Sequence, residues 1–207
     1  MTLPNVDGER PRGSYAKGIA RRQQILDRAI EVFAQRGSDR TSLRAIAQEV
    51  GVTHSALTHY FGSLEELLVE VYRESVRQID GDSPEPPPET TPGEMMRSSA
   101  ERNRQVPGMV QLYSTLVAAA LEDGHDAAHA FATERFAGLR AHLADRVRDN
   151  QAEGRLRRDV DPELVAALVI AASDGLQTQW LLDPAVDHEA ALGMLDRLLA
   201  APDSAAG

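Results

Sequence analysis

Cysteine is absent from the 207 residues of this chain. Disulfides, thiolate metal sites and cysteine nucleophiles are therefore excluded, and the chain is compatible with a reducing compartment. Long apolar runs are also missing: none approaches the roughly 20 residues of a membrane-spanning helix, and the N-terminus lacks the apolar centre of a signal peptide. We therefore expect a cytoplasmic protein that does not use a membrane as a partner.

The sequence lacks the alternating pattern of β-strands as well, and it has no internal repeat. Apolar residues recur at helical spacing instead, so the chain is predicted to be all-α. Five prolines within residues 83–92 exclude a regular helix there and predict a linker or stiff loop. The expected helices cover residues 21–37, 41–51, 53–61, 63–79, 109–120, 126–150, 162–182 and 188–200.

The net charge of −10 is unevenly distributed. Residues 1–60 carry nine Lys or Arg against six Asp or Glu, whereas the remainder carries 13 against 26. A basic end on an acidic protein can still dock phosphates. Residues 1–18, which contain Arg10, Arg12 and Lys17, are predicted to form a flexible basic arm.

Residues 41–61, TSLRAIAQEVGVTHSALTHYF, have the parts of a helix-turn-helix: a short capped helix, a glycine turn at Gly51, and a second helix with a polar side. Two packed helices with no DNA partner would have the same spacing, but the basic arm favours DNA binding. The polar side can hydrogen-bond to base edges or phosphates. Its members are Thr53, His54, Ser55, Thr58, His59 and Tyr60.

Residues 21–72, from RRQQILDRAIEVF to LEELLVEVY, resemble the N-terminal DNA-binding domain of the TetR family of transcriptional regulators. Phe33 and Gly37, the T-S-L-R-A-I-A segment, the E-V-G-V turn and the following Tyr-Phe carry the resemblance. It implies a helix-turn-helix domain over residues 19–62 and an effector-binding and dimerisation domain over residues 63–207. The D-G-L-Q-T-Q-W-L-L-D-P stretch within residues 162–200 resembles the last two helices of one branch of the family.

Two positions depart from the family pattern. Thr58 stands where the family commonly has tyrosine, and Leu64 stands where it commonly has lysine, both usually phosphate contacts. Their absence implies lower affinity or greater reliance on other contacts, because each lost phosphate contact removes a counterion-release contribution. The expected contacts outside the polar side of the second helix are Arg21, Arg22, Thr41 and Arg44.

The resemblance also implies a small-molecule effector in the C-terminal half. We expect it between the helices at 109–120 and 126–150, although the same residues could simply fill a helical core. A largely apolar ligand is expected, with an anionic or carbonyl group facing Arg135. The candidate lining residues are Met109, Tyr113, Leu116, Phe131, Arg135, Leu139, Gln177 and Trp180.

The helix predicted at 162–182 is apolar on every side from Leu164 to Ala172. One face must therefore meet its own subunit and the other something outside it. Together with the helix at 188–200 it is predicted to form a four-helix bundle across the two-fold axis of a homodimer. The expected function is a repressor that a small molecule releases from a pseudo-palindromic operator; activation by ligand and regulation without ligand also fit the sequence.

Two other functions were weighed. His125 and His129, with Asp126 between them, resemble the H-E-x-x-H pattern of a metal-dependent hydrolase, and an all-helical protein-interaction module needs no DNA. Asp126 is explained more simply as a carboxylate at a helix N-terminus. His142 and His188 are expected on the surface. We therefore expect no enzymatic activity and no cofactor.

Overall fold

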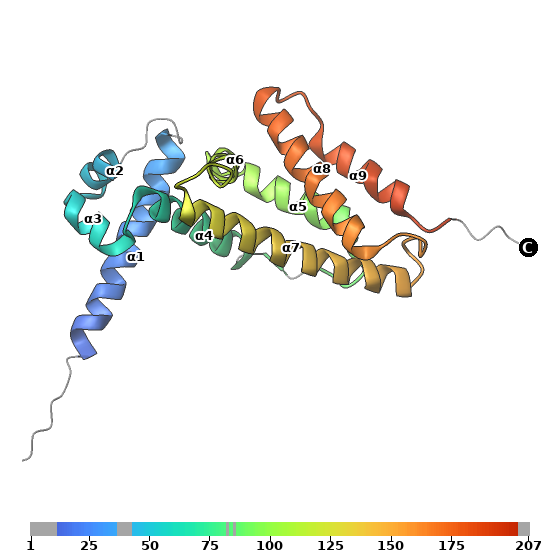
Figure 1. Cartoon of the computed structure of the whole chain (residues 1–207), viewed down its shortest axis with the longest axis horizontal. Helices are drawn as coiled ribbons and strands as arrows, with labels where there is room; N and C mark the ends of the chain where they lie inside the picture. The colour runs from blue at the N-terminus through green and yellow to red at the C-terminus, as the bar shows by residue number, and fades with distance from the viewer. Residues whose placement is uncertain (1–11, 37–42, 82, 85, 203–207) are drawn as a thin grey trace, which may run out of the picture.

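The structure is a computed structural model that describes residues 12–36, 43–81, 83–84 and 86–202. These residues form α-helices and one isolated β-bridge between Leu156 and Ala200, so the predicted all-α fold is confirmed. The helices run in the order α1 (Arg12–Arg36), α2 (Leu43–Val50), α3 (His54–Phe61), α4 (Leu64–Gly81), α5 (Pro92–Arg104), α6 (Met109–Ala119), α7 (Asp126–Ala152), α8 (Pro162–Leu182) and α9 (His188–Leu199) (Figure 1).

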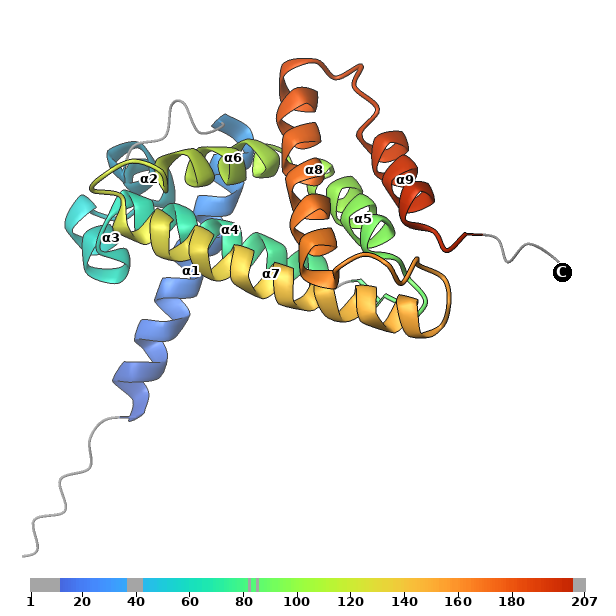
Figure 2. The same ribbon diagram turned by 45° about the vertical axis from the view of Figure 1, so that its right-hand side comes forward.

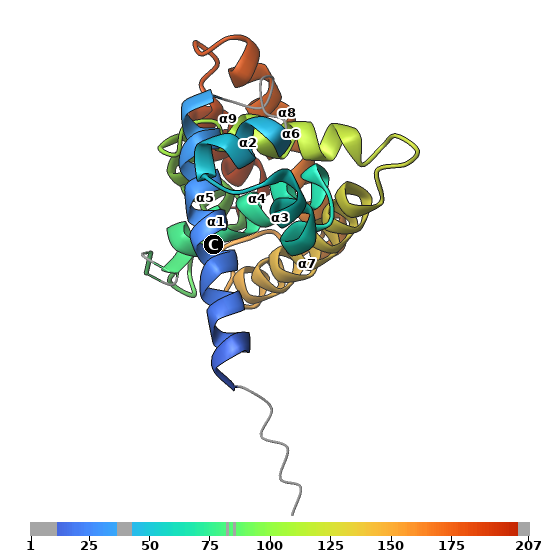
Figure 3. The same cartoon turned by 90° about the vertical axis from the view of Figure 1, so that its left-hand side faces the viewer.

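Helices α1, α2 and α3 lie together at one end of the molecule (Figure 3). Leu26 and Ile46 are buried between them with Leu57 and Phe61. The turn between α2 and α3 depends on Gly51, whose φ of 72° lies in the left-handed region that glycine adopts without strain. The short, sharp connection fixes the direction of α3 relative to α2.

The first helix is longer than its apolar stripe. It begins at Arg12 rather than at Arg21, so residues 12–18, expected in a flexible arm, belong to α1. Its early turns bury no described apolar residue, and periodicity alone therefore missed them. Residues 1–11 of the expected arm lie outside the described part of the chain.

Helix α4 connects the two ends of the molecule. It packs against α1 and α3 at one end and against α6 and α7 along its length. Figures 1 and 2 show α4 and α7 running side by side into the C-terminal bundle, where α8 packs along α7, and α5 and α9 pack against α8 and against each other. The bundle has its own apolar cluster, in which Leu143, Val169 and Leu192 are fully buried.

Helix α5 was not predicted, because the proline-rich segment was interpreted as a linker or stiff loop and the next apolar stripe began only at Met109. Thr91 caps the helix by accepting a hydrogen bond from the Glu94 N–H at 3.2 Å, and the Glu94 side chain accepts one from the Thr91 N–H at 2.9 Å. Pro92 occupies the first turn, where its missing N–H costs nothing. The sequence T-P-G-E thus contained a capping-box signal that marks the helix start.

Helix α8 is long and apolar enough to cross a membrane by length and composition alone, which differs from the expectation for the sequence. In the fold it packs against α5, α6, α7 and α9, and it buries Ser173 and Gln177 as well as apolar residues. These contacts are those of a core helix in a helical bundle.

Gly93 allows the N-terminus of α5 to approach α9. Its N–H donates to Asp196 Oδ1 at 3.0 Å, and a Cβ at this position would overlap the Asp196 carboxylate. We expect Gly93→Ala to lower the free energy of unfolding by about 1–3 kcal/mol, measured by urea denaturation. Gly138→Ala is the control, since a Cβ meets nothing on this helical position and alanine favours the helix. Equal stability of the two variants would contradict this role of Gly93.

Candidate functional site

Helix α3 presents an exposed polar surface to solvent. His54, Ser55, Thr58 and His59 are all exposed on it. Thr53 serves the backbone, because its hydroxyl accepts a hydrogen bond from the Ala56 N–H at 3.1 Å and caps the helix. Thr53 was predicted to contact DNA, but its hydroxyl is the group that caps α3.

Tyr60 and Thr58 are also engaged within the domain. Tyr60 is half-buried against the N-terminal core and meets the His59 ring edge-on at 5.5 Å. The Thr58 hydroxyl donates to the His54 carbonyl at 3.1 Å but keeps a free lone pair. Among the described residues, the exposed α3 side chains with unused hydrogen-bonding groups are therefore those of His54, Ser55 and His59, with Thr58 as an acceptor.

The residues predicted to contact DNA phosphates outside α3 differ in their surroundings. Arg21 is exposed and, within the described part of the chain, donates to Gln24 alone, at 3.3 Å. Arg22 donates to Glu70 of α4 at 2.7 Å, and its guanidinium lies 4.8 Å from the centre of the Phe61 ring. Thr41 and the side chain of Arg44 lie outside the described residues. Arg22 thus ties α1 to α4, whereas Arg21 is free to meet a phosphate.

This difference makes two arginine variants distinguishable. Arg21→Ala is expected to weaken binding to all DNA sequences and to reduce the slope of log K against log salt by about 1, with unchanged stability. Arg22→Ala is expected to lower the free energy of unfolding by about 1 kcal/mol, through loss of the Glu70 ion pair and the Phe61 contact. Fluorescence anisotropy over a salt series and urea denaturation measure the two effects. Identical behaviour of both variants would contradict the assignment.

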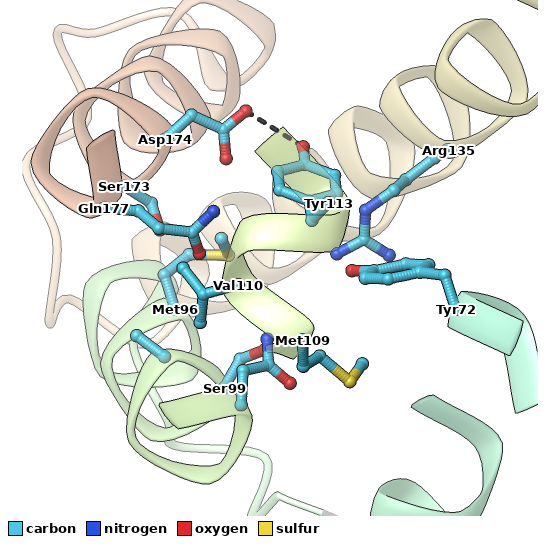
Figure 4. A pocket seen from close by; sticks show the side chains of 12 residues that line it. Tyr72, Met96, Ser99, Met109, Val110, Tyr113, Arg135, Ser173, Asp174 and Gln177 are labelled. Carbon is cyan, nitrogen blue, oxygen red and sulfur yellow. Dashed lines mark hydrogen bonds between the residues drawn. The ribbon is translucent and has the colours of Figure 1, made fainter. Parts of the chain in front are cut away.

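A cluster of polar side chains lies buried where α4, α6, α7 and α8 meet (Figure 4). The rings of Tyr72 and Tyr113 stack at 5.5 Å, and the Arg135 guanidinium lies 5.3 Å and 5.0 Å from their centres. The Tyr113 hydroxyl donates to Asp174 Oδ2 at 3.0 Å. Burial raises the pKa of Tyr72 to about 12 and also raises the pKa of Tyr113, so both tyrosines stay protonated as donors; burial raises the pKa of the Asp174 carboxyl as well.

Arg135 borders three cavities. The smallest, of about 20 Å³, surrounds Tyr113 and Asp174 and has room for a water molecule at most. A cavity of about 450 Å³ lies between α4 and α7. The largest, of about 680 Å³, is enclosed by α4, the proline-rich segment, α5 and α7. The larger two are of a size that holds a small organic molecule.

The predicted ligand-binding residues divide between these cavities and other places. Met109, Tyr113 and Gln177 line the small cavity with Arg135, while Phe131 and Leu139 line the one of about 450 Å³. Leu116 is buried in the N-terminal core cluster, and Trp180 lies beside Arg104, whose guanidinium is 5.5 Å from its ring. Neither Leu116 nor Trp180 borders the three cavities that Arg135 lines.

Sequence reasoning missed the contributions of α4 and α5 to these cavities. Tyr72, Val76 and Asp80 come from α4, none of whose residues was among the predicted ligand contacts. Met96, Ser99 and Arg102 come from α5, which was not predicted. The polar residues of α5 gave no apolar stripe, so its capping box was the signal that could have revealed it.

Comparison with known protein families shows to which family the chain belongs. The family described as "Bacterial regulatory proteins, tetR family" matches residues 25–71, and "BetI-type transcriptional repressor, C-terminal" matches residues 95–202. The chain belongs to the TetR family. Its helix-turn-helix is thus that of a TetR-family DNA-binding transcriptional regulator, as the sequence predicted.

Several relatives of this TetR-family chain have names or structures. The HTH-type transcriptional repressor Rv1474c of Mycobacterium tuberculosis is 29% identical over 80% of this chain and 85% of its own length. A TetR-family member from Streptomyces coelicolor A3 is 31% identical, with a TM-score of 0.62 over 86% of this chain and 98% of that one. The multidrug binding protein EbrR complexed with proflavin is 30% identical, with a TM-score of 0.58 over 86% of this chain and 99% of that one.

The two histidines that were considered as metal ligands, His125 and His129, have different surroundings in this TetR-family fold. His125 Nδ1 lies 2.6 Å from Glu65 Oε1, and the other Glu65 oxygen accepts from the Ala127 N–H at 3.1 Å. Glu65 thus joins the start of α4 to the start of α7. His129 is exposed, and the described residues contain no group of three or more His, Asp or Glu side chains that could hold a metal ion.

His142 and His188 were both predicted to lie on the surface. His142 is exposed, as predicted, although it borders the two larger cavities. His188, expected on the surface, is only 2% exposed, so that prediction was wrong. Burial and the nearby Arg104 guanidinium lower the pKa of His188, which keeps the ring neutral in the packing of the C-terminal bundle.

Proposed function

We propose that this protein is a homodimeric repressor that places two α3 helices in successive major grooves of a pseudo-palindromic operator and is released by a small molecule. The observation that carries the DNA-binding part is the exposed polar face of the capped helix α3, where the side chains of His54, Ser55 and His59 make no hydrogen bond to any described residue. The BetI-type repressor description of residues 95–202 supports repression as the mode of regulation. We further propose that it acts in the cytoplasm.

Control by a small molecule is supported by the position of α4. Along this one helix, Glu70 pairs with Arg22 of α1, and Tyr72, two residues later, packs against Arg135 beside the cavities. A ligand that shifts Arg135 changes the packing of α4 and therefore the support of the DNA-binding end. The ligand releases DNA if it binds the shifted geometry more tightly, and the coupling is reciprocal.

Dimerisation is supported by an exposed apolar stripe on α8 and α9. Leu164 and Leu168 are 66% and 63% exposed, and Ala171 and Gly175 continue the same face of α8 at helical spacing. On α9, Leu198 is 67% exposed. A monomer gains nothing from this surface, whereas a two-fold symmetric partner would cover it with the same residues. Ala166 was expected to face the partner, but it is buried within its own subunit.

Selection of genomic DNA fragments on the purified protein tests the proposal. We expect enrichment of a pseudo-palindrome whose half-sites are spaced by a multiple of about one helical turn. Binding to it should fall steeply with salt and persist in the presence of a chelator. Failure to enrich any shared sequence, with protein shown to be folded by circular dichroism, would contradict operator recognition.

A further inference from the structure

We infer that the cavity of about 680 Å³ binds an organic monoanion, a small molecule with one carboxylate and an apolar body. The inference rests on the effector-controlled function proposed above and names the chemical class of the effector. It also moves the expected position of the ligand, from between α6 and α7 to the space between α4, α5, α7 and the proline-rich segment.

The charges that line this cavity are unbalanced. Two arginines, Arg102 and Arg135, and one carboxylate, Asp80, border it. Asp80 Oδ1 lies 3.8 Å from Arg102 Nη2, whereas Arg135 has no ion pair among the described residues. Asp174 attracts the half-buried Arg135 guanidinium without a direct ion pair, so an anionic ligand beside Arg135 would add a closer counter-charge and stabilise the site. The described residues that line the cavity thus carry one net positive charge, which favours an anionic ligand.

Both arginines have unused hydrogen-bonding capacity. Arg102 Nε and Arg135 Nε are buried and have no hydrogen-bond partner among the described residues. A guanidinium presents its donors in a planar fork, and a carboxylate accepts from such a fork with two oxygens. Ser98, Ser99 and Asn103 of α5 add further polar groups to the same wall.

The acidic side chains near the cavity that the structure describes are paired or lie elsewhere, which disfavours a cationic ligand. Glu134 of α7 pairs with Arg73 at 2.7 Å. Asp174 accepts the Tyr113 hydroxyl and borders the small cavity rather than the large one. A cation in the large cavity would therefore lie beside Arg135 without a free carboxylate to offset the repulsion.

Apolar residues form the rest of the wall. Val76, Met95, Met96 and Leu139 contribute aliphatic and thioether surface, and Pro84, Pro86 and Pro87 complete it. The methionines can adapt to ligands of different shape. This composition fits the apolar body of the ligand, with its carboxylate at the arginine end.

The proline-rich segment is a built wall of this cavity. Arg146 of α7 donates to the carbonyls of Pro87 and Pro88 through Nη1, at 3.0 and 3.2 Å, and to that of Pro86 through Nη2 at 3.2 Å. Asn150 Nδ2 donates to the Thr90 carbonyl at 3.3 Å. Prolines have no N–H for a backbone ladder, so these side chains hold the segment over α7. The cavity is thus formed before a ligand arrives.

Three probes that share one aromatic body test the inference by isothermal titration at low salt: 2-naphthoate, 2-naphthamide and (2-naphthylmethyl)trimethylammonium. We expect saturable binding of the carboxylate, at least about tenfold tighter than the amide, and no binding of the ammonium. Arg135→Met and Arg102→Met should each weaken the carboxylate by about tenfold or more. Arg148→Met, an exposed arginine of α7 outside the cavity, is the control and should leave the affinity unchanged.

Preference for the ammonium, equal affinity for the three probes, no saturable carboxylate binding, or unchanged affinity in both cavity variants would each overturn the inference. Anisotropy of a selected operator fragment separates this outcome from failure of the proposed function. If the carboxylate binds through both arginines but leaves operator binding unchanged, the anion site stands and effector control fails. If only uncharged or cationic compounds release the operator, effector control stands and the anion site fails.

Discussion

Replacement of Leu168 by arginine is expected to convert the protein to monomers and to weaken operator binding by on the order of 10²-fold or more. Leu168 is 63% exposed on α8, at the centre of the stripe that includes Leu164 and Ala171. In a symmetric interface the substitution would place two like charges in a desolvated contact, which costs more than any rearrangement recovers. Each monomer then binds one half-site without the high effective concentration of its partner.

Light scattering at micromolar concentration and anisotropy with a full operator measure the two effects. Leu121→Arg is the matched control, because Leu121 is an 86% exposed leucine in the turn after α6, away from α8 and α9. It should remain dimeric. If the wild-type protein is monomeric, or if the Leu168→Arg and Leu164→Arg variants both remain dimeric, the apolar stripe is not the dimer interface.

The second large effect is expected on DNA specificity. Ser55 and His59 are exposed one turn apart on α3, and replacing both by alanine removes hydrogen-bonding groups without disturbing a buried contact. Each base contact contributes roughly 1–3 kcal/mol of discrimination. We therefore expect the ratio of operator to non-specific affinity to fall by on the order of 10²-fold, with the dimer and its stability unchanged.

Competition anisotropy with operator and scrambled DNA, together with a footprint, measures this ratio. His129→Ala combined with Thr133→Ala is the matched control, because these residues form an exposed pair with the same spacing on α7. The control should keep full discrimination. A Ser55→Ala, His59→Ala variant with an unaltered footprint and unaltered ratio would assign base recognition to other residues.

Much of the local structure could be predicted from short-range signals. Thr53, Asp161 and Asp187 cap α3, α8 and α9 at or next to the predicted helix starts, since a cap depends only on the residues of one helical turn. The positive φ of Gly51 follows from the same kind of local chemistry. The T-S-L-R-A-I-A and E-V-G-V segments predict the position of the second helix of the helix-turn-helix, and the exposure of Ser55 and His59 agrees with that position.

The ligand site shows where such signals end. An apolar stripe indicates that a helix face is covered, but it does not say by which other helix. Arg135 was recognised as an unusual polar residue, yet its neighbours Tyr72, Asp174 and Arg102 come from three other helices. One of these, α5, has few apolar residues and starts directly after the prolines, so periodicity did not detect it.

The sequence by itself thus determined the helices that carry an apolar stripe, the helix-turn-helix and the family, because each depends on neighbours in the chain or on a contiguous motif. Only the tertiary structure decided that Arg22 pairs with Glu70, that His188 is buried, and that Arg135 borders a cavity walled by prolines. The physical reason is the same in all three cases. Partners far apart in sequence are chosen by how whole helix faces pack together, and neither composition nor spacing within one helix specifies that arrangement.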